Sequence, residues 1–146
     1  FLKAGKLVIG QTANILFSVE LTRRLAGCGI TANAVHPGAI ATTDLARHLG
    51  PSDFGEMMRR TKFSDRVPFK SMEAGAATSV WAAVAPELEG CGGLYLEDCH
   101  VAEVSDDPDN GQSGCRSYAT DPLAARRLWS LSEQLAGERF AWGDDD

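Results

Sequence analysis

The sequence predicts an α/β fold with a parallel sheet, of the kind that closes a larger doubly wound domain. Two short apolar runs, at 30–36 and 94–102, are typical of buried strands. Helical patterns precede, separate and follow them, and strands separated by helices imply parallel pairing with right-handed crossovers. Two strands are too few for a stable sheet, and both faces of a parallel sheet need cover. We therefore expect residues 1–146 to form a single partial domain.

The first elements of the chain are a helix and the strand that it leads into. Residues 1–11 show no clear period, so we expect an extended stretch or a strand remnant there. From 12 to 26, apolar residues recur at three- and four-residue steps, which predicts an amphipathic helix. Gly27 and Gly29 end this helix, and the strand at 30–36 follows. The apolar stripe consists of Ala13, Ile15, Leu16, Phe17, Val19, Leu21 and Leu25.

A loop and a mixed region follow the strand at 30–36. The loop runs from Pro37-Gly38 to Thr42, and residues 44–50 indicate one or two helical turns that end at Gly50. Residues 52–70 have no regular pattern. We interpret the apolar side chains in this region as loop residues packed on the core, with a mobile helical flap as the alternative. They are Met57, Met58 and Phe63.

The second half of the chain predicts a helix, a strand and a closing helix. Ser71 caps a helix that extends to about Ala85 and is nearly all small and apolar, and we expect Ala77, Trp81 and Val84 to face the sheet. The run at 94–102 predicts a strand, at least over its first half. Asp121-Pro122 opens the last helix and Gly137 ends it, with residues 138–146 as a frayed tail. Its stripe is Ala124, Leu128, Leu131 and Leu135, with Trp129 alongside.

Composition excludes several classes of function. The net charge is −6, of which the terminal Asp144, Asp145 and Asp146 supply three charges. Without a basic cluster, nucleic acid and anionic membranes are poor partners, and pairs such as Arg23-Arg24 read as solvated helix faces. No apolar run is long enough to span a membrane, and no signal peptide is visible. The chain does not begin with Met, which we expect of a fragment or a processed product.

The cysteines and histidines do not form a site of their own. Cys28, Cys91, Cys99 and Cys115 match no metal-binding spacing, so we expect free thiols, a cytoplasmic location and no metal. The hydrolase elbow G-x-S-x-G is absent, and Cys99 and His100 would point to opposite faces of a strand.

The acidic run at 106–111 fails the calcium-loop register and reads as a solvated turn. The match to G-x-G-x-x-A at 27–32 follows a helix rather than a strand, so it is not a dinucleotide loop.

The most informative candidate site is the loop that begins at Pro37-Gly38. Ligands of open α/β sheets bind at the carboxyl ends of strands. Proline fixes the exit from the strand, and glycine lets a flat ring or an amide approach the backbone. The hydroxyl of Thr42 could then bind a polar ligand group. A simple turn is the alternative reading of Pro-Gly.

Taken together, several segments resemble the second half of a short-chain dehydrogenase/reductase of the retinol-dehydrogenase-like subgroup. They are Thr12-Ala-Asn-Ile-Leu-Phe-Ser-Val-Glu-Leu, Thr31-Ala-Asn-Ala-Val-His-Pro-Gly38, Ala76-Ala-Thr-Ser-Val-Trp, Gly93-Leu-Tyr-Leu-Glu-Asp-Cys and Asp121-Pro-Leu-Ala-Ala-Arg-Arg-Leu-Trp129. The resemblance covers about residues 12–136. It implies a Rossmann domain that uses NAD or NADP to oxidise an alcohol or reduce a carbonyl of a small molecule. The loop residues Pro37, Gly38, Ile40 and Thr42 would hold the nicotinamide end.

The resemblance also exposes a departure at the catalytic positions. The family uses a Tyr as general acid/base and a Lys four residues later. Without gaps these positions are Leu7 and Gln11, and a two-residue deletion would place Ile9 at the tyrosine and leave no lysine. We therefore assign no catalytic residue and expect an inactive oxidoreductase fragment. The alternative is a non-catalytic interaction or dimerisation module, because the helix from Thr12 would match the family's usual dimer interface.

Overall fold

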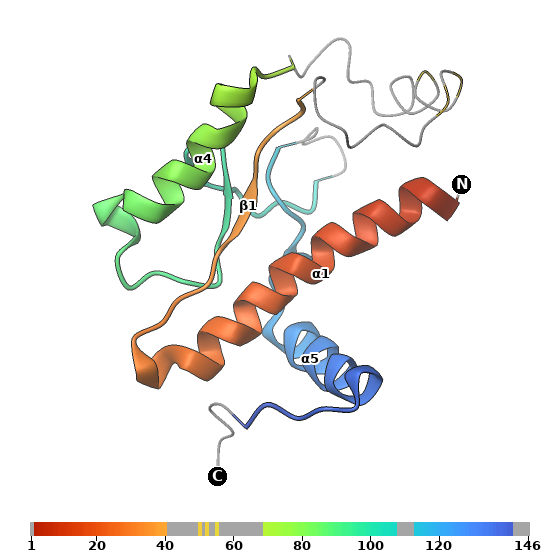
Figure 1. The fold of residues 1–146 in the computed structure, drawn as a ribbon, viewed down its shortest axis with the longest axis vertical. Coiled ribbons are helices and arrows are strands. Elements are labelled where there is room, and N and C mark those ends of the chain that lie inside the picture. Colours follow the sequence, from red (N-terminus) through yellow and green to blue (C-terminus); the bar gives the residue numbers. More distant parts are fainter. Residues whose placement is uncertain are drawn as a thin grey trace.

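The structure is a computed structural model that describes residues 2–40, 50, 52, 55, 69–107 and 113–141. Within these residues the fold is α/β, with a mixed three-stranded sheet and three long helices. Thr42, nearly all of the helical segment predicted at 44–50, and Met57, Met58 and Phe63 lie outside the described residues, as does part of the acidic run at 106–111. Figure 1 shows the sheet between α4 (Met72–Val84) on one side and α1 (Leu2–Leu25) on the other.

Helix α1 begins earlier than the sequence analysis expects. It is continuous from Leu2 to Leu25, so the expected extended stretch before Thr12 is wrong. The sequence analysis missed the first turns of the helix because their amphipathic period is weak, although their backbone is helical. The turn η1 (Ala26–Cys28) follows, and Gly29 adopts a left-handed conformation with φ of 67°, which confirms the predicted glycine stop. The chain therefore reverses at the place where the sequence indicates.

The sheet confirms the predicted parallel pairing and adds a hairpin. Strand β1 (Ala34–His36) pairs in parallel with β2 (Tyr95–Glu97). The predicted strand at 94–102 is correct over its first half. It then turns at Asp98 and Cys99, whose φ values are 46° and 58°, and returns as the antiparallel β3 (His100–Val101). Positive φ at both central residues is the signature of a two-residue hairpin turn that follows the twist of the strands.

Helix α4 begins as predicted but buries a different face. Ser71 caps it by accepting a hydrogen bond from the Ala74 amide at 3.2 Å, yet its buried residues are Gly75 and Thr78. The expected inward positions were wrong for Ala77, which is exposed, and for Val84, which is 71% exposed; Trp81 is partly buried. Because the helix is apolar all round, its composition could not indicate which side packs closest to the sheet.

Helix α5 (Pro122–Ala136) has the predicted ends. Asp121 accepts hydrogen bonds from the amides of Leu123 and Ala124, and Gly137 ends the helix with φ of 72°. Its buried residues are Ala125 and Trp129, whereas the predicted stripe members Leu131 and Leu135 are exposed. The buried face of α5 is therefore narrower than its leucine pattern indicates.

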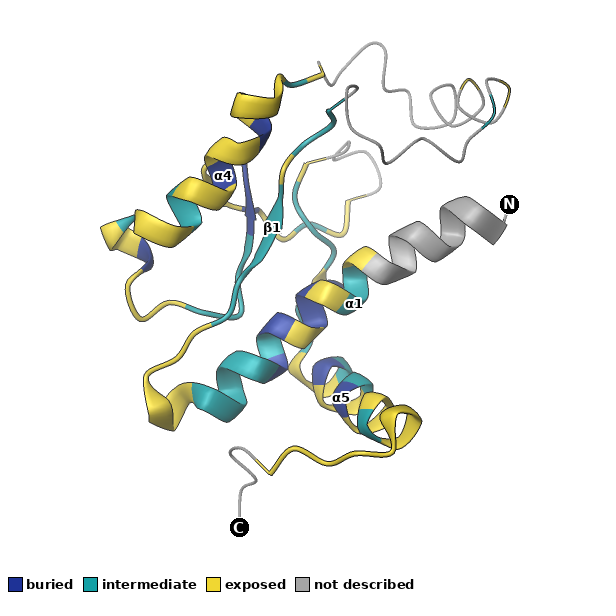
Figure 2. Ribbon diagram, viewed as in Figure 1, coloured by how far each residue is buried: buried dark blue, intermediate teal, exposed yellow. Residues whose placement is uncertain are grey.

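The core lies in two places. One is the contact between α1 and α5, and the other is β2 with the segments around it, as the dark residues in Figure 2 show. The outer face of α4 is exposed (Figure 2). The buried hydrophobic residues are Ile15, Leu16, Leu88, Leu96, Ala102, Ala119, Ala125 and Trp129. This packing holds the carboxyl ends of β1 and β2 side by side, where the candidate loop begins.

Candidate functional site

The candidate loop leaves the carboxyl end of β1 and lies beside the end of β2. Its first turn is fixed locally, because the Gly38 amide donates a hydrogen bond to Nδ1 of His36 at 3.3 Å. Gly38 has φ of 81°, a conformation that favours glycine. Pro37 is exposed, while Gly38 and Ile40 are half-buried. Three of the four predicted cofactor-loop residues therefore lie together, and the fourth, Thr42, is outside the described residues.

The start of α4 covers one side of this loop. The Lys70 amide donates a hydrogen bond to the Ala39 carbonyl at 2.8 Å. The stem of Lys70 lies over Gly38, since a Cβ on Gly38 would come within 2.7 Å of its Cδ and Cε. The side chain of Ile40 fills the space beside Gly75 that a Cβ would need. Sequence analysis could not find these contacts, because 69–75 is distant from the loop along the chain.

The turn between β2 and β3 closes the other side of the same edge. The carboxylate of Asp98 forms an ion pair with the Lys70 ammonium. The hydrogen bond from Lys70 lowers the pKa of Asp98; burial opposes this effect, and the charges of Lys70, His100 and His36 reinforce it. The Cys99 amide donates to Oγ1 of the buried Thr78 at 3.3 Å. The turn is thus anchored both to Lys70 and to α4.

Two further titratable side chains lie on β2, and the sequence analysis gives neither a role. Glu97 is only 5% exposed, and it accepts hydrogen bonds from the Ser113 hydroxyl at 2.8 Å and the Gly114 amide at 2.6 Å. Burial, with the charges of Glu97 and Cys115, raises the pKa of Tyr95 to about 12. The Tyr95 phenol is therefore protonated at neutral pH. Residues 95 and 97 are two positions apart on a strand, so their side chains lie on the same face. This spacing is the sequence signal that could have placed them together.

The two positions aligned with the family's proton-transfer pair fall on α1. Positions 7 and 11 are one helical turn apart, which agrees with a pair that acts together. They carry Leu and Gln, and Gln11 is exposed. Neither residue type exchanges protons at neutral pH. In the alternative alignment, with a two-residue deletion, Ile9 takes the tyrosine position and no lysine position remains.

A second polar cluster joins α1 to α5, away from the loop. Glu20, with 1% of its surface exposed, binds the guanidinium groups of Arg23 and Arg24 at 2.9 and 2.8 Å. Burial raises the pKa of Glu20, but the hydrogen bonds and charges of the two arginines outweigh it, so the pKa is lowered. The reading of Arg23-Arg24 as a solvated pair was wrong, because both contact this buried carboxylate.

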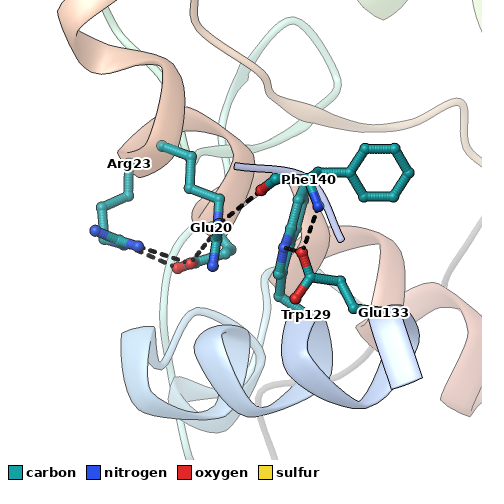
Figure 3. Close-up of polar contacts among 6 residues, drawn as sticks. Glu20, Arg23, Trp129, Glu133 and Phe140 are labelled. Carbon is teal, nitrogen blue, oxygen red and sulfur yellow. Dashed lines mark hydrogen bonds and ion pairs between the residues drawn. The ribbon is translucent and has the colours of Figure 1, made fainter. Parts of the chain in front are cut away.

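An aromatic group completes the same cluster (Figure 3). Arg24 lies 4.7 Å from the centre of the Trp129 ring, and Phe17 stacks on that ring at 5.5 Å. Trp129 Nε1 and the Phe140 amide both donate to Glu133 Oε1 at 2.9 Å. Phe140, within the predicted frayed tail, is thereby tied to α5; residues 142–146 of that tail lie outside the described part. The cluster stabilises the fold and contributes no group to the loop.

A hollow lies away from the loop, among the described residues. It has a volume of about 310 Å³ and lies near the amino end of β1, between the end of α1 and the start of the strand. No three metal-ligating side chains gather in the described part of the chain. Over the same residues, no helix has the length and apolar character needed to cross a membrane. The lining residues of the hollow are Thr22, Ala26, Gly29, Ile30, Thr31 and Gly90.

Comparison with known proteins identifies relatives among oxidoreductases. No family model matches the chain. The WW domain-containing oxidoreductase of Danio rerio is 43% identical over 130 residues, which are 88% of this chain and 27% of that protein. The "probable oxidoreductase" of Streptomyces lividans is 43% identical over 122 residues, or 82% of this chain and 40% of that protein.

A third relative carries the subgroup name. Retinol dehydrogenase 13 of Mus musculus is 39% identical over 135 residues, which are 91% of this chain and 36% of that protein. The chain therefore spans between about a quarter and two-fifths of the length of these relatives. Across that span, the chain belongs to the short-chain dehydrogenase/reductase family, with retinol dehydrogenases among its relatives.

Proposed function

We propose that this chain is the nicotinamide-side, C-terminal portion of a Rossmann-type oxidoreductase that transfers hydride between NAD(P) and a small alcohol or carbonyl compound. The observation that carries the proposal is the Pro37–Gly38 loop at the carboxyl end of a parallel strand pair. This is the place where open α/β sheets bind ligands. The names of the relatives, which include retinol dehydrogenases, support the reaction class.

The residues of the loop suit the nicotinamide end of such a cofactor. Gly38 has no side chain of its own, but the Lys70 stem fills the place of its Cβ, so a flat ring would approach the loop backbone from another side. Pro37 is exposed beside it. When bound, NAD(P) would supply the hydride, and the loop would orient the ring. The substrate and the choice between NAD and NADP are left open by this part of the molecule.

We further propose that the chain alone does not turn over substrate. Hydride transfer to a carbonyl needs a proton donor held beside the cofactor and substrate. The matching positions hold Leu7 and Gln11, or Ile9 where two residues are deleted, and none of these side chains can donate the proton. Tyr95 is a tyrosine on β2 with a raised pKa, which makes it a weak acid at neutral pH.

Titration with NADH and with NADPH, followed by nicotinamide fluorescence, tests the cofactor role. We expect saturable binding that Gly38→Ala weakens, because a side chain there meets Lys70 and φ is positive. Gly90→Ala is the matched control, since Gly90 has a similar φ of 72° and open space around its Cβ position. If neither nucleotide binds, or both variants bind like the parent chain, the loop is not a cofactor site.

A second candidate function is an interaction module, and the edge of the sheet favours it. Among the described strands, β1 lies at an edge. The Ala34 amide faces β2, since it donates to the Leu94 carbonyl at 2.9 Å. In a parallel ladder the amide of the next residue, Val35, faces the opposite side. That edge can pair with another strand.

Sedimentation velocity at micromolar concentration measures this association. We expect the chain to self-associate, and Val35→Pro to shift it toward monomer, because proline lacks the donor at position 35 and edge strands tolerate it. Leu135→Ala on the exposed face of α5 is the control and should leave the profile unchanged. A monodisperse monomer for the parent chain would contradict the module.

A further inference from the structure

Lys70 is the residue that joins the two segments at the carboxyl edge of the sheet. Its amide holds the Ala39 carbonyl at 2.8 Å. Its aliphatic stem covers Gly38 on the side where a Cβ would point. Its ammonium then reaches Asp98 in the turn between β2 and β3. One side chain thus crosses from the candidate loop to the neighbouring hairpin.

Each end of this connection is itself held in place. Ser71, the next residue, caps α4, and Ile40 packs against Gly75 one turn into that helix. At the other end, the Cys99 amide is bound to Thr78 of the same helix. Lys70 therefore bridges two segments that both contact α4.

We propose that Lys70 is a positioning residue that straps the Pro37–Ile40 loop to the β2–β3 turn and so sets the loop conformation that would receive the nicotinamide. The inference rests on the proposed function for its ligand, and on the contacts of Lys70 for the strap itself. Two parts of the side chain act separately. The stem packs on Gly38, and the ammonium sets the direction in which the stem lies.

Amide hydrogen exchange of the chain without ligand tests the strap directly. The reporting amides are Gly38, Ala39 and Ile40, and the reference amides are those of α5. Lys70→Met keeps a long stem and removes the charge, so we expect these loop amides to exchange about two- to fivefold faster, in keeping with a partly exposed ion pair. Lys70→Ala removes the stem as well, and we expect about a tenfold increase or more.

Asp98→Asn and the double variant separate a strap from general loss of stability. Asparagine tolerates the left-handed conformation of position 98, so Asp98→Asn should reproduce Lys70→Met, and the double variant should add nothing further. Raising salt from about 0.05 M to about 0.5 M should accelerate loop exchange in the parent chain but not in Lys70→Met. Arg126→Met, an exposed position on α5, is the control and should leave the loop amides unchanged.

Nucleotide titration of the same proteins then links the strap to binding. If the parent chain binds NADH or NADPH, Lys70→Met should weaken binding by the factor by which it accelerates loop exchange. Equal binding by the parent chain and the variant, despite faster exchange, would overturn the positioning role. If the parent chain binds neither nucleotide, the proposed function fails, while the exchange data still decide whether Lys70 straps the loop.

Three exchange results would overturn the strap. One is loop exchange that neither Lys70 variant changes. Another is an equal rise in the loop and in α5, which would mean global loss of stability. The last is an additive effect of the Lys70→Met and Asp98→Asn changes, which would mean that the two groups act independently.

Discussion

A single glycine determines how closely α4 approaches the candidate loop. Gly75 is buried, and the side chain of Ile40 occupies the place where its Cβ would stand. Glycine lowers the stability of a helix interior by about 1 kcal/mol relative to alanine. The close contact with the loop offsets this cost, because the Ile40 side chain packs directly against Gly75.

At this position we expect Gly75→Ala to lower the free energy of unfolding by up to about 2 kcal/mol. The gain in helix propensity is about 1 kcal/mol, and the steric overlap with Ile40 costs about 1–3 kcal/mol. Urea denaturation measures the difference. Gly27→Ala is the control, because nothing lies within 4 Å of its Cβ position. A variant at Gly75 more stable than the parent chain would show that Ile40 can move aside.

At the scale of elements, the contact between α1 and α5 depends on the Trp129 indole. Trp129 is buried, stacks on Phe17 and lies under the Arg24 guanidinium, while its Nε1 binds Glu133. Arg24 also binds Glu20. One ring therefore connects the two helices by packing and by a cation–π contact, and its hydrogen bond to Glu133 lies within α5.

We expect Trp129→Leu to lower the free energy of unfolding by about 2–4 kcal/mol. Part of the loss comes from the smaller buried side chain, and part from the aromatic and cation–π contacts. Urea denaturation followed by far-UV circular dichroism gives the value. Leu135→Ala on the same helix is the control and should change stability by less than about 0.5 kcal/mol, because Leu135 is 80% exposed. Similar losses for both variants would contradict the assignment.

The ends of elements could be predicted from the sequence because local chemistry sets them. Ser71, the Asp121-Pro122 pair and Gly137 act within one turn of their own positions. The turn at Asp98-Cys99 could not, since Asp-Cys is not a usual sequence for two left-handed residues. The inward face of α4 could not either, because a uniformly apolar helix carries no directional pattern.

In the candidate site, too, the local features could be predicted from the sequence and the contacts between distant segments could not. Pro37, Gly38 and Ile40 could be placed in one loop from the sequence, since they are neighbours on the chain and follow a strand. Lys70 and Asp98 could not be joined to them, because only the packing of α4 on the sheet brings them together. The burial of Glu20 could not be predicted from the sequence for a similar reason, since it depends on how α5 packs on α1.

At the scale of the whole molecule, charge makes stability depend on pH. Several described carboxyls have a pKa below the ordinary value in the folded state, chiefly because hydrogen bonds or nearby cations favour the ionised form. Such groups contribute stability that is present above their unfolded pKa and is lost as the pH falls through the folded one. They are Glu20, Glu73, Asp98, Asp106 and Glu133.

We therefore expect the urea concentration at the unfolding midpoint to decrease as the pH is lowered from about 5 to about 3. Glu20→Gln should lower stability at neutral pH and make this fall shallower, because a buried carboxylate paired with two arginines no longer has to take up a proton. The exposed Glu103→Gln should keep the slope of the parent chain. A midpoint independent of pH over this range would contradict the role given to these carboxyls.

If copies of this chain associate through their sheets, as proposed above, the short hairpin at the end of β2 should limit how large the assembly grows. Strand β3 is two residues long, so it offers a poor template for a further strand, whereas β1 offers the longer edge. When two copies pair β1 with β1, the β1 edge of each copy is covered by the other. The two copies are then related by a two-fold axis, and of the described strands only the short β3 edges remain open. Any assembly built on this sheet should therefore stop at a pair and form no fibre.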